Sequence, residues 1–389
     1  MRYLRTHPTK IAVYIILALL VIIPFLSIHD STQAAASNIT LTPSVQMAFP
    51  NTITFKIQAQ SNSVITQLRL HYIVDRQNFA QVTSEGWPTF NPAASINTQW
   101  VWDMRKSAIP VGTKVSYWWT AIDATGNNAT SNQATIEFDD TQHQWQSITD
   151  GPITLLWYSG NTTFANALMA AAQEGLQKIE NDIGVIPQGT VRIFIYASQS
   201  DLLNAQLFPP QWEGGVTFQG FDVIAIGVPT NQLSYGVDVT PHELTHWATG
   251  HLVFNSYGAG LPTWLDEGLA TYVQDEPDSN WLNLAIKQNK LISVRTLSSP
   301  FSAVAEQAYI SYAESHSIVS FLLGMTNGKE KMLQLLNVFH EGATYDDALQ
   351  QVYGFDQDGL DQLWRKSIGV NVSEAPLNSE TELALVLNN

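Results

Sequence analysis

The chain has 389 residues, enough for two domains, and 45% of them are hydrophobic, which supports packed cores rather than a disordered chain. Only 13% of the residues are charged, and the formal net charge of -16 excludes binding to nucleic acid or anionic lipid through bulk charge. The sequence has no cysteine, which excludes a disulfide framework, a thiol nucleophile and cysteine-ligated zinc.

Residues 1–36 have the layout of an export signal. Arg2, Arg5 and Lys10 give the segment a positive start. An almost unbroken apolar run follows over residues 11–28, and three alanines before Ser37 offer a cleavage site. The run is close to the minimum length of a membrane span, so an uncleaved signal anchor is the alternative. In both cases we expect the rest of the chain to be secreted or to lie at the extracytoplasmic surface, with membrane contact only through that anchor.

Residues 38–140 alternate between apolar and polar side chains, as the strands of a half-buried sheet do. The clearest stretches are 52–57, 67–72, 114–123 and 134–138, and a turn-forming segment follows residue 123. Short strands at regular spacing over about a hundred residues predict an all-β, immunoglobulin-like sandwich. Such a domain binds, spaces or orients, and nothing in it is typical of a catalytic site.

From residue 150 to 370 the pattern changes to strands followed by helices. Strands are predicted at 153–157, 191–196 and 222–227, an amphipathic helix at 164–183, and mainly helices after residue 241. This order predicts an α+β domain, so the chain is expected to be multidomain with a junction at 139–148. Residues 374–389 carry no sorting or anchor motif and are predicted to be a C-terminal tail.

The segment His242-Glu243-Leu244-Thr245-His246 has the H-E-x-x-H pattern. On a helix, His242 and His246 lie one turn apart on one face, so both imidazoles can point at one metal ion. Glu243 beside them can take a proton from a water molecule on that ion. The alternative is a capping box in which Thr240, Pro241 and Glu243 begin a helix, and Glu243 then folds back on the helix start.

A second segment, Trp264-Leu265-Asp266-Glu267-Gly268-Leu269-Ala270, argues against that alternative. Pro262 marks the start of another helix, on which Glu267 can supply a third ligand. His251 is out of register by one residue with the pattern H-E-x-x-H-x-x-G-x-x-H, so we do not choose it. Two histidines and one glutamate, with a fourth position open to water, are typical of a catalytic zinc site.

Together the two segments resemble those of a gluzincin metallopeptidase, most closely the bacterial peptidase-MA-like group and more distantly the aminopeptidase-N-like and thermolysin-like enzymes. The resemblance covers about residues 153–368 and leaves the sandwich outside. It implies one Zn²⁺ ion per chain, held by His242, His246 and Glu267, with Glu243 as the general base.

Tyr312 begins a segment that resembles the next helix of aminopeptidase-N-like enzymes, in which a tyrosine hydroxyl stabilises the tetrahedral oxyanion. The resemblance gives that role to Tyr312, and a phenol donor beside a metal suits it chemically. An ordinary core tyrosine is the alternative. Tyr309 and His316, at helical spacing from Tyr312, are the substitutes.

The sequence departs from aminopeptidase-N-like enzymes at their Gly-x-Met-Glu-Asn strand, which grips the free amino group of the substrate. Residues 212–220 contain no such motif. Glu213 is a candidate substitute for its glutamate, but we interpret it as a surface-loop glutamate. The same region can still offer a strand edge to a peptide.

We therefore predict an exported zinc endopeptidase that acts on peptide or protein substrates; no pattern predicts its oligomeric state. A surface binding protein with a non-catalytic metallopeptidase-like domain is the second hypothesis, and an aminopeptidase is the third. Asp266 and Thr271 are candidates for the oxygen that accepts the other N–H of each histidine.

Overall fold

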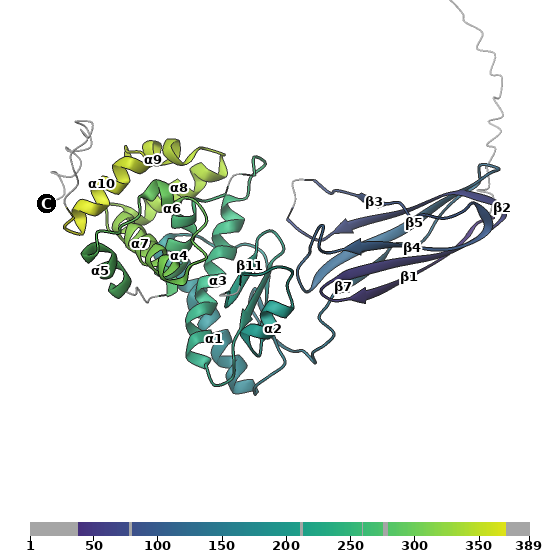
Figure 1. The fold of residues 1–389 in the computed structure, drawn as a ribbon, viewed down its shortest axis with the longest axis horizontal. Helices are drawn as coiled ribbons and strands as arrows, with labels where there is room; N and C mark the ends of the chain where they lie inside the picture. Colours follow the sequence, from purple (N-terminus) through teal and green to yellow (C-terminus); the bar gives the residue numbers. More distant parts are fainter. Residues whose placement is uncertain (1–37, 78–79, 211–212, 259, 275–278, 371–389) are drawn as a thin grey trace, which may run out of the picture. The chain divides into compact units, whose positions relative to one another are not determined.

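The computed structural model describes residues 38–77, 80–210, 213–258, 260–274 and 279–370 (Figure 1). The predicted export segment at 1–36 and the predicted tail at 374–389 lie outside the described residues. Among the described residues, no helix combines the length and the apolar composition that a membrane crossing requires.

The first described region is β-rich, as predicted. Its strands form one seven-stranded sheet in which all the pairs are antiparallel. They are β1 (Thr40–Ala48), β2 (Thr52–Val74), β3 (Ser84–Gly86), β4 (Ala93–Asp103), β5 (Thr113–Asp123), β6 (Asn128–Thr130) and β7 (Ala134–Phe138).

Strand β2 organises this sheet because its two halves take different partners. Residues 52–60 pair with β1 and β4, residues 65–74 pair with β5, and the register shifts between the halves. The two stretches predicted at 52–57 and 67–72 are therefore parts of one strand. Ile53, Phe55 and Ile57 alternate into the core with 0% exposure, as the period of two requires. The immunoglobulin-like arrangement stays a prediction.

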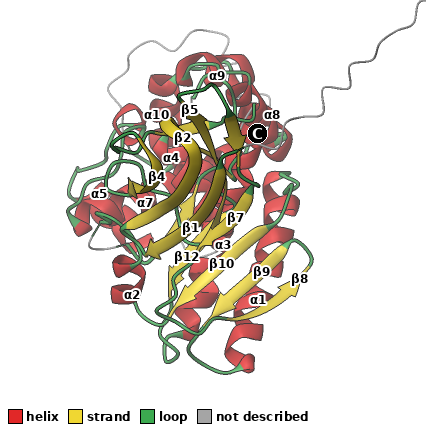
Figure 2. Cartoon of the chain, turned by 90° about the vertical axis from the view of Figure 1, so that its right-hand side faces the viewer, coloured by secondary structure: helices red, strands yellow, loops and turns green. Residues whose placement is uncertain are grey.

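A second, five-stranded sheet has the order β11-β12-β10-β9-β8. Its strands are β8 (Gln146–Asp150), β9 (Ile153–Trp157), β10 (Val191–Tyr196), β11 (Gly215–Phe218) and β12 (Val223–Gly227). The central pairs are parallel, and the two edge strands β8 and β11 run antiparallel to their neighbours. Figure 2 shows β12, β10, β9 and β8 side by side. The three predicted strands are confirmed. Edge strand β11 lies in the region 212–220, for which a strand edge was suggested, whereas β8 was not predicted.

Two of the described α-helices lie between the strands of this sheet, and helices make up most of the chain after its last strand. They are α1 (Thr162–Lys178), which continues as one π-helical segment (Ile179–Ile183), α2 (Gln199–Asn204), α3 (Leu233–Val253), α4 (Thr263–Gln274), α5 (Ser279–Lys287), α6 (Val294–Leu297), α7 (Ala305–Leu323), α8 (Gly328–His340), α9 (Tyr345–Tyr353) and α10 (Gln357–Ser367). Helix α3 packs against α1, α4, β11 and β12, and α4 packs against α7. The helix with the H-E-x-x-H pattern thus lies inside the packed region.

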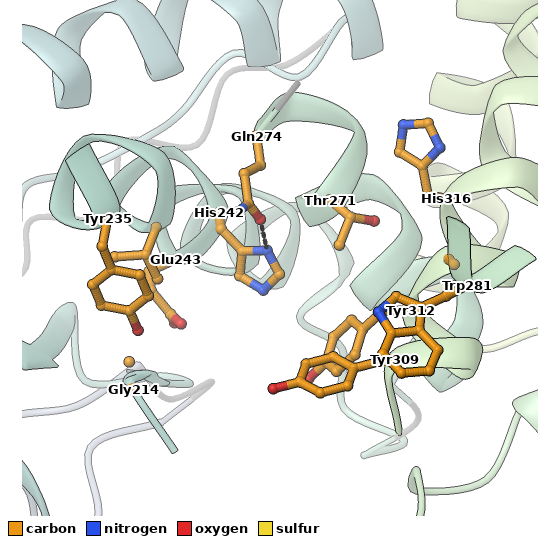
Figure 3. Close-up of a pocket in the computed structure, with 13 residues that line it drawn as sticks. Gly214, Tyr235, His242, Glu243, Thr271, Gln274, Trp281, Tyr309, Tyr312 and His316 are labelled. Atoms are coloured by element: carbon orange, nitrogen blue, oxygen red, sulfur yellow. Dashed lines mark hydrogen bonds between the residues drawn. The ribbon is translucent and has the colours of Figure 1, made fainter. Parts of the chain in front are cut away.

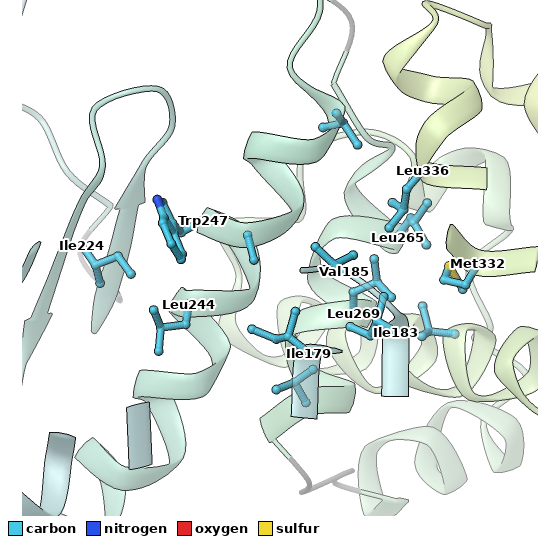
Figure 4. Packing of buried hydrophobic residues seen from close by; sticks show 14 of the residues in the cluster. Ile179, Ile183, Val185, Ile224, Leu244, Trp247, Leu265, Leu269, Met332 and Leu336 are labelled. Carbon is cyan, nitrogen blue, oxygen red and sulfur yellow. The ribbon is translucent and has the colours of Figure 1, made fainter. Parts of the chain in front are cut away.

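Apolar packing on two sides of α3 fixes its position. Leu244 and Trp247 face Ile224 of β12, and Leu265 and Leu269 of α4 lie on the other side of α3 in the same buried cluster (Figure 4). Each fully buried side chain of this size contributes about 1.5–3 kcal/mol relative to an exposed one. Burial on both sides holds α3 between the sheet and α4.

Helix α3 begins earlier than the capping-box alternative requires. It starts at Leu233, so Thr240 and Pro241 lie in its interior. That alternative for Glu243 is therefore wrong. The Pro241 ring lies where α1 crosses α3: a Cβ atom on Gly175 would lie 2.9 Å from the Cβ of Pro241. Glycine at 175 lets the two helices approach closely.

Glu314 of α7 is a buried carboxyl group with 0% exposure. The Ile292 N–H donates to its two oxygens at 3.2 and 3.0 Å. Burial raises the pKa of Glu314 to about 8, although the Ile292 N–H and Arg365 act in the opposite direction. The folded protein therefore holds this proton at pH values at which the unfolded chain releases it.

We expect Glu314→Gln to flatten the pH dependence of stability. Because the pKa of Glu314 rises from 4.5 to about 8 on folding, its contribution is fully present below pH 4.5 and is lost as pH rises through 8. Each pKa unit corresponds to about 1.4 kcal/mol, so the wild type should lose a few kcal/mol of unfolding free energy over that range. Urea unfolding at several pH values measures this loss, with the exposed Glu330→Gln as control. Equal pH slopes for wild type and Glu314→Gln would contradict the expectation.

Candidate metal centre

The structure brings the three predicted ligand side chains together. His242 and His246 lie on α3, and Glu267 lies in the first half of α4. Their ligand atoms all lie within 4.8 Å of one another. The two histidine Nε2 atoms are 3.2 Å apart, and Glu267 Oε2 lies 3.4 Å from Nε2 of His242 and 3.5 Å from Nε2 of His246. Their role as metal ligands stays a prediction.

The other ring nitrogen of each histidine faces an oxygen acceptor. His246 Nδ1 lies 2.9 Å from Asp266 Oδ1, and His242 Nδ1 lies 3.1 Å from Gln274 Oε1. A neutral imidazole carries one N–H, and these acceptors favour it at Nδ1. The Nε2 lone pairs of both rings then point at the space that they share with Glu267, which is the arrangement a metal ion needs.

The charge around this space also fits a cation. Glu267 Oε2 is buried and has no hydrogen-bond partner among the described residues. Burial opposes a charge on His246, but the carboxylates of Asp266 and Glu267 outweigh burial and raise the pKa of His246 well above 6.5. Burial likewise opposes a charge on Glu267, yet His246 and His242 lower the pKa of Glu267 below its usual range. Both shifts have one cause: the buried oxygens require a positive charge, which a proton or a metal ion can supply.

Glu243 and Tyr312 line one cavity of about 480 Å³ together with His242 (Figure 3). Glu243 is 5% exposed, and its Oε2 accepts a hydrogen bond from the Thr217 hydroxyl at 2.8 Å. The ring centroids of Tyr312 and His242 are 6.4 Å apart. Burial, and then the charges of Glu267 and Glu243, raise the pKa of Tyr312 far above 10, so its phenol stays protonated and able to donate.

The two substitutes for Tyr312 line the same cavity. The Tyr309 ring stacks on Trp281 with a centroid separation of 5.4 Å, and Tyr309 is 53% exposed. The His316 ring stacks on Tyr272 at 6.0 Å. The Tyr312 ring packs against His242. The choice among the three for the oxyanion role stays a prediction.

Of the two candidate hydrogen-bond partners of the histidines, one lies against a histidine. Asp266 accepts from His246. Thr271 is not the hydrogen-bond partner of His242, because its hydroxyl donates to the carbonyl oxygen of Glu267 at 2.7 Å. Gln274 takes that place and was not predicted. Gln274 follows Glu267 by two helical turns (274 − 267 = 7 positions) on the same helix face, a spacing that could have found it.

The interpretation of Glu213 as a surface-loop glutamate is wrong. Its side chain is partly buried, and Gln206 Nε2 donates to its Oε1. Burial, and further the charge of Glu243, raise the pKa of Glu213 above its usual value. It directly precedes Gly214 and Gly215, which line the cavity. The carboxylate therefore lies close enough to this site to influence it.

Comparisons with known proteins bear mainly on the second half of the chain. Residues 171–370, which are 200 of the 389 residues, match a family model described as the Peptidase MA superfamily. None of the curated proteins compared with the chain matches it.

Several solved structures are similar at low identity. Aminopeptidase A of Legionella pneumophila, in complex with aspartic acid, is 10% identical with a TM-score of 0.40, over 85% of this chain and 50% of that chain. The sporulation control protein Spo0M of Bacillus subtilis is 9% identical with a TM-score of 0.19, over 35% and 55%. A Br derivative of BhCBM56 is 16% identical with a TM-score of 0.18, over 25% and 90%. This chain thus spans about half the length of the aminopeptidase and of Spo0M. TM-scores this low support no conclusion about function.

The hydrogen bonds of the histidines predict how tightly this site would hold a zinc ion. We expect Asp266→Ala and Gln274→Ala each to weaken zinc affinity by about 10- to 100-fold, because each histidine loses the acceptor that orients its ring. Competition with a zinc-binding dye measures the affinity. Thr271→Val is the matched control, since its hydroxyl bonds the backbone. A loss for Thr271→Val as large as that for Gln274→Ala would overturn the assignment.

Proposed function

The chain belongs to the Peptidase MA superfamily, and we propose that it is an exported zinc endopeptidase. The superfamily suggests a peptidase-type function. The convergence of His242, His246 and Glu267 beside Glu243 is the observation that carries the proposal. The export-signal layout of residues 1–36 supports a location outside the cytoplasm.

Each residue of the site has a chemical role in this proposal. His242, His246 and Glu267 would hold the zinc ion, which would supply Lewis acidity toward the scissile carbonyl and toward a water molecule. The Glu243 carboxylate accepts a proton from the attacking water and passes it to the leaving amine. The Tyr312 phenol donates a hydrogen bond to the oxygen that becomes negative in the transition state.

The charges of the cavity support action within a peptide rather than at its carboxyl end. The described residues that line the cavity include no lysine or arginine. A free carboxylate of the substrate would therefore meet Glu243 with no lysine or arginine among the described lining residues to hold it. A peptide without a terminal charge at this point avoids that repulsion.

An aminopeptidase is the second candidate, and one observation favours it. The partly buried Glu213 carboxylate precedes the cavity-lining glycines and interacts with Glu243 through charge. A carboxylate at this point can hold the free amino group of a substrate. The endopeptidase stays preferred because the Gly-x-Met-Glu-Asn segment is missing.

Loss of the general base tests the reaction. We expect Glu243→Gln to lower kcat on casein or peptides by about 10²- to 10⁴-fold, the usual contribution of general acid–base catalysis, with zinc content unchanged. Exposed Glu174→Gln on α1 should match the wild type. Full activity in Glu243→Gln would remove the proposed base. A wild type that binds zinc and cleaves nothing across a broad peptide library would instead indicate a binding protein.

Blocked peptides separate the two candidate peptidases. We expect interior bonds of peptides with free and with acetylated amino termini to be cleaved at comparable rates, in wild type and in Glu213→Gln. Mass spectrometry of the products measures the positions of cleavage. A strict need for a free amino terminus, lost together with activity in Glu213→Gln, would assign the protein as an aminopeptidase.

A further inference from the structure

We propose that Thr217, on the edge strand β11, is a positioning residue that holds the Glu243 carboxylate in its working orientation, and that Gly215 provides the space for it. This inference rests on the proposed function, because it concerns the orientation of the proposed general base. Neither residue belongs to the H-E-x-x-H segment or to the segment around Glu267.

Alternate residues of β11 face α3. A Cβ atom on Gly215 would meet Glu243, and the Thr217 hydroxyl donates to Glu243. Just beyond the strand, Gln219 Nε2 donates to the carbonyl oxygen of His246 at 3.3 Å. The intervening Val216 and Phe218 pack against a separate apolar cluster. This period of two is that of a strand, so β11 presents a polar row to the catalytic face of α3 and an apolar row to the core.

The Thr217 hydroxyl contacts Glu243 at two atoms. Its Oγ1 lies 2.8 Å from Glu243 Oε2 and 2.8 Å from the Glu243 carbonyl oxygen. A hydroxyl has one proton, so it donates to one of these acceptors at a time, and the charged carboxylate is the stronger acceptor. A glutamate side chain is otherwise free to change rotamer, and a general base acts only from within hydrogen-bond reach of its water.

Gly215 is required for space rather than for backbone conformation. It has no positive φ angle, so its backbone could accept another residue. A Cβ atom there, however, would lie 2.7 Å from Glu243 Oε1 and 3.1 Å from Glu243 Cδ. The nearest atom is the end of a side chain that can move, so alanine would displace the carboxylate and leave the strand intact.

The kinetic test compares two substitutions at one position. We expect Thr217→Val, which keeps the shape and removes the hydroxyl, to lower kcat by about 10- to 100-fold, with KM and zinc content unchanged. Thr217→Ser restores the donor and should recover most of kcat. Gly215→Ala should lower kcat in the same way. Thr149→Val is the control, because it removes a 3.0 Å hydroxyl–hydroxyl contact to Thr154 at the opposite edge of the same sheet.

Unchanged turnover in these variants would overturn the inference. An unchanged kcat in Thr217→Val excludes positioning by Thr217. A lower urea midpoint in Thr217→Val, with kcat unchanged and no difference between valine and serine in turnover, assigns Thr217 a purely structural role. An unchanged kcat in Gly215→Ala would overturn the part of the inference that concerns Gly215.

A double-mutant cycle in zinc-free protein tests the contact without activity. Thr217→Val, Glu243→Ala and the double variant are unfolded in urea, and we expect the midpoint shift of the double variant to be smaller than the sum of the single shifts. Additive shifts would overturn the contact while leaving the proposed function intact. A wild type that cleaves no peptide would instead overturn the proposed function, and the cycle would still report whether Thr217 holds Glu243.

Discussion

A concentration of partly buried negative charge is the constraint on which this site depends. Glu267 is held between the two imidazoles, Asp266 lies against one of them, and Glu243 is almost fully buried nearby. Carboxylates out of contact with water are costly unless a cation or hydrogen-bond donors compensate them. The two imidazoles cannot by themselves satisfy Glu267 Oε2. A divalent cation at this point would satisfy the oxygen and both nitrogens together.

Apolar packing supplies the rigidity that this arrangement needs. The H-E-x-x-H helix is buried on both sides, and α4 is pressed against α7 so closely that a Cβ atom on Gly268 would lie 2.6 Å from the Ser315 carbonyl oxygen. Glycine directly after Glu267 thus allows α7 to approach the ligand helix. That approach brings Tyr312 to the cavity. The geometry of the site therefore depends on packing contacts between helices that do not involve the proposed catalytic groups.

Two parts of the fold form the site, and each contributes different groups. Helices α3 and α4 supply the proposed ligands and the partners of their ring nitrogens, whereas edge strand β11 meets the proposed base from the other side. Strand β11 runs antiparallel to β12, and its side chains alternate between two faces. One short strand therefore contacts both the apolar cluster and the cavity. Glu213 precedes the same strand, so the region that distinguishes the two candidate peptidases is also the one that contacts Glu243.

The sequence by itself determined what depends on spacing within one element. His242 and His246 share a face because residues four apart on a helix lie one turn apart. The segment around Glu267 was recognisable from its own residues. The strands at 134–138, 153–157 and 191–196 followed from runs of β-forming residues. Only the tertiary structure decided that α3 begins before Thr240, that Gln274 rather than Thr271 accepts from His242, and that Thr217 reaches Glu243. The reason is physical: local periodicity is set by backbone geometry, whereas which polar atoms of distant segments meet is set by how the apolar faces of those segments pack.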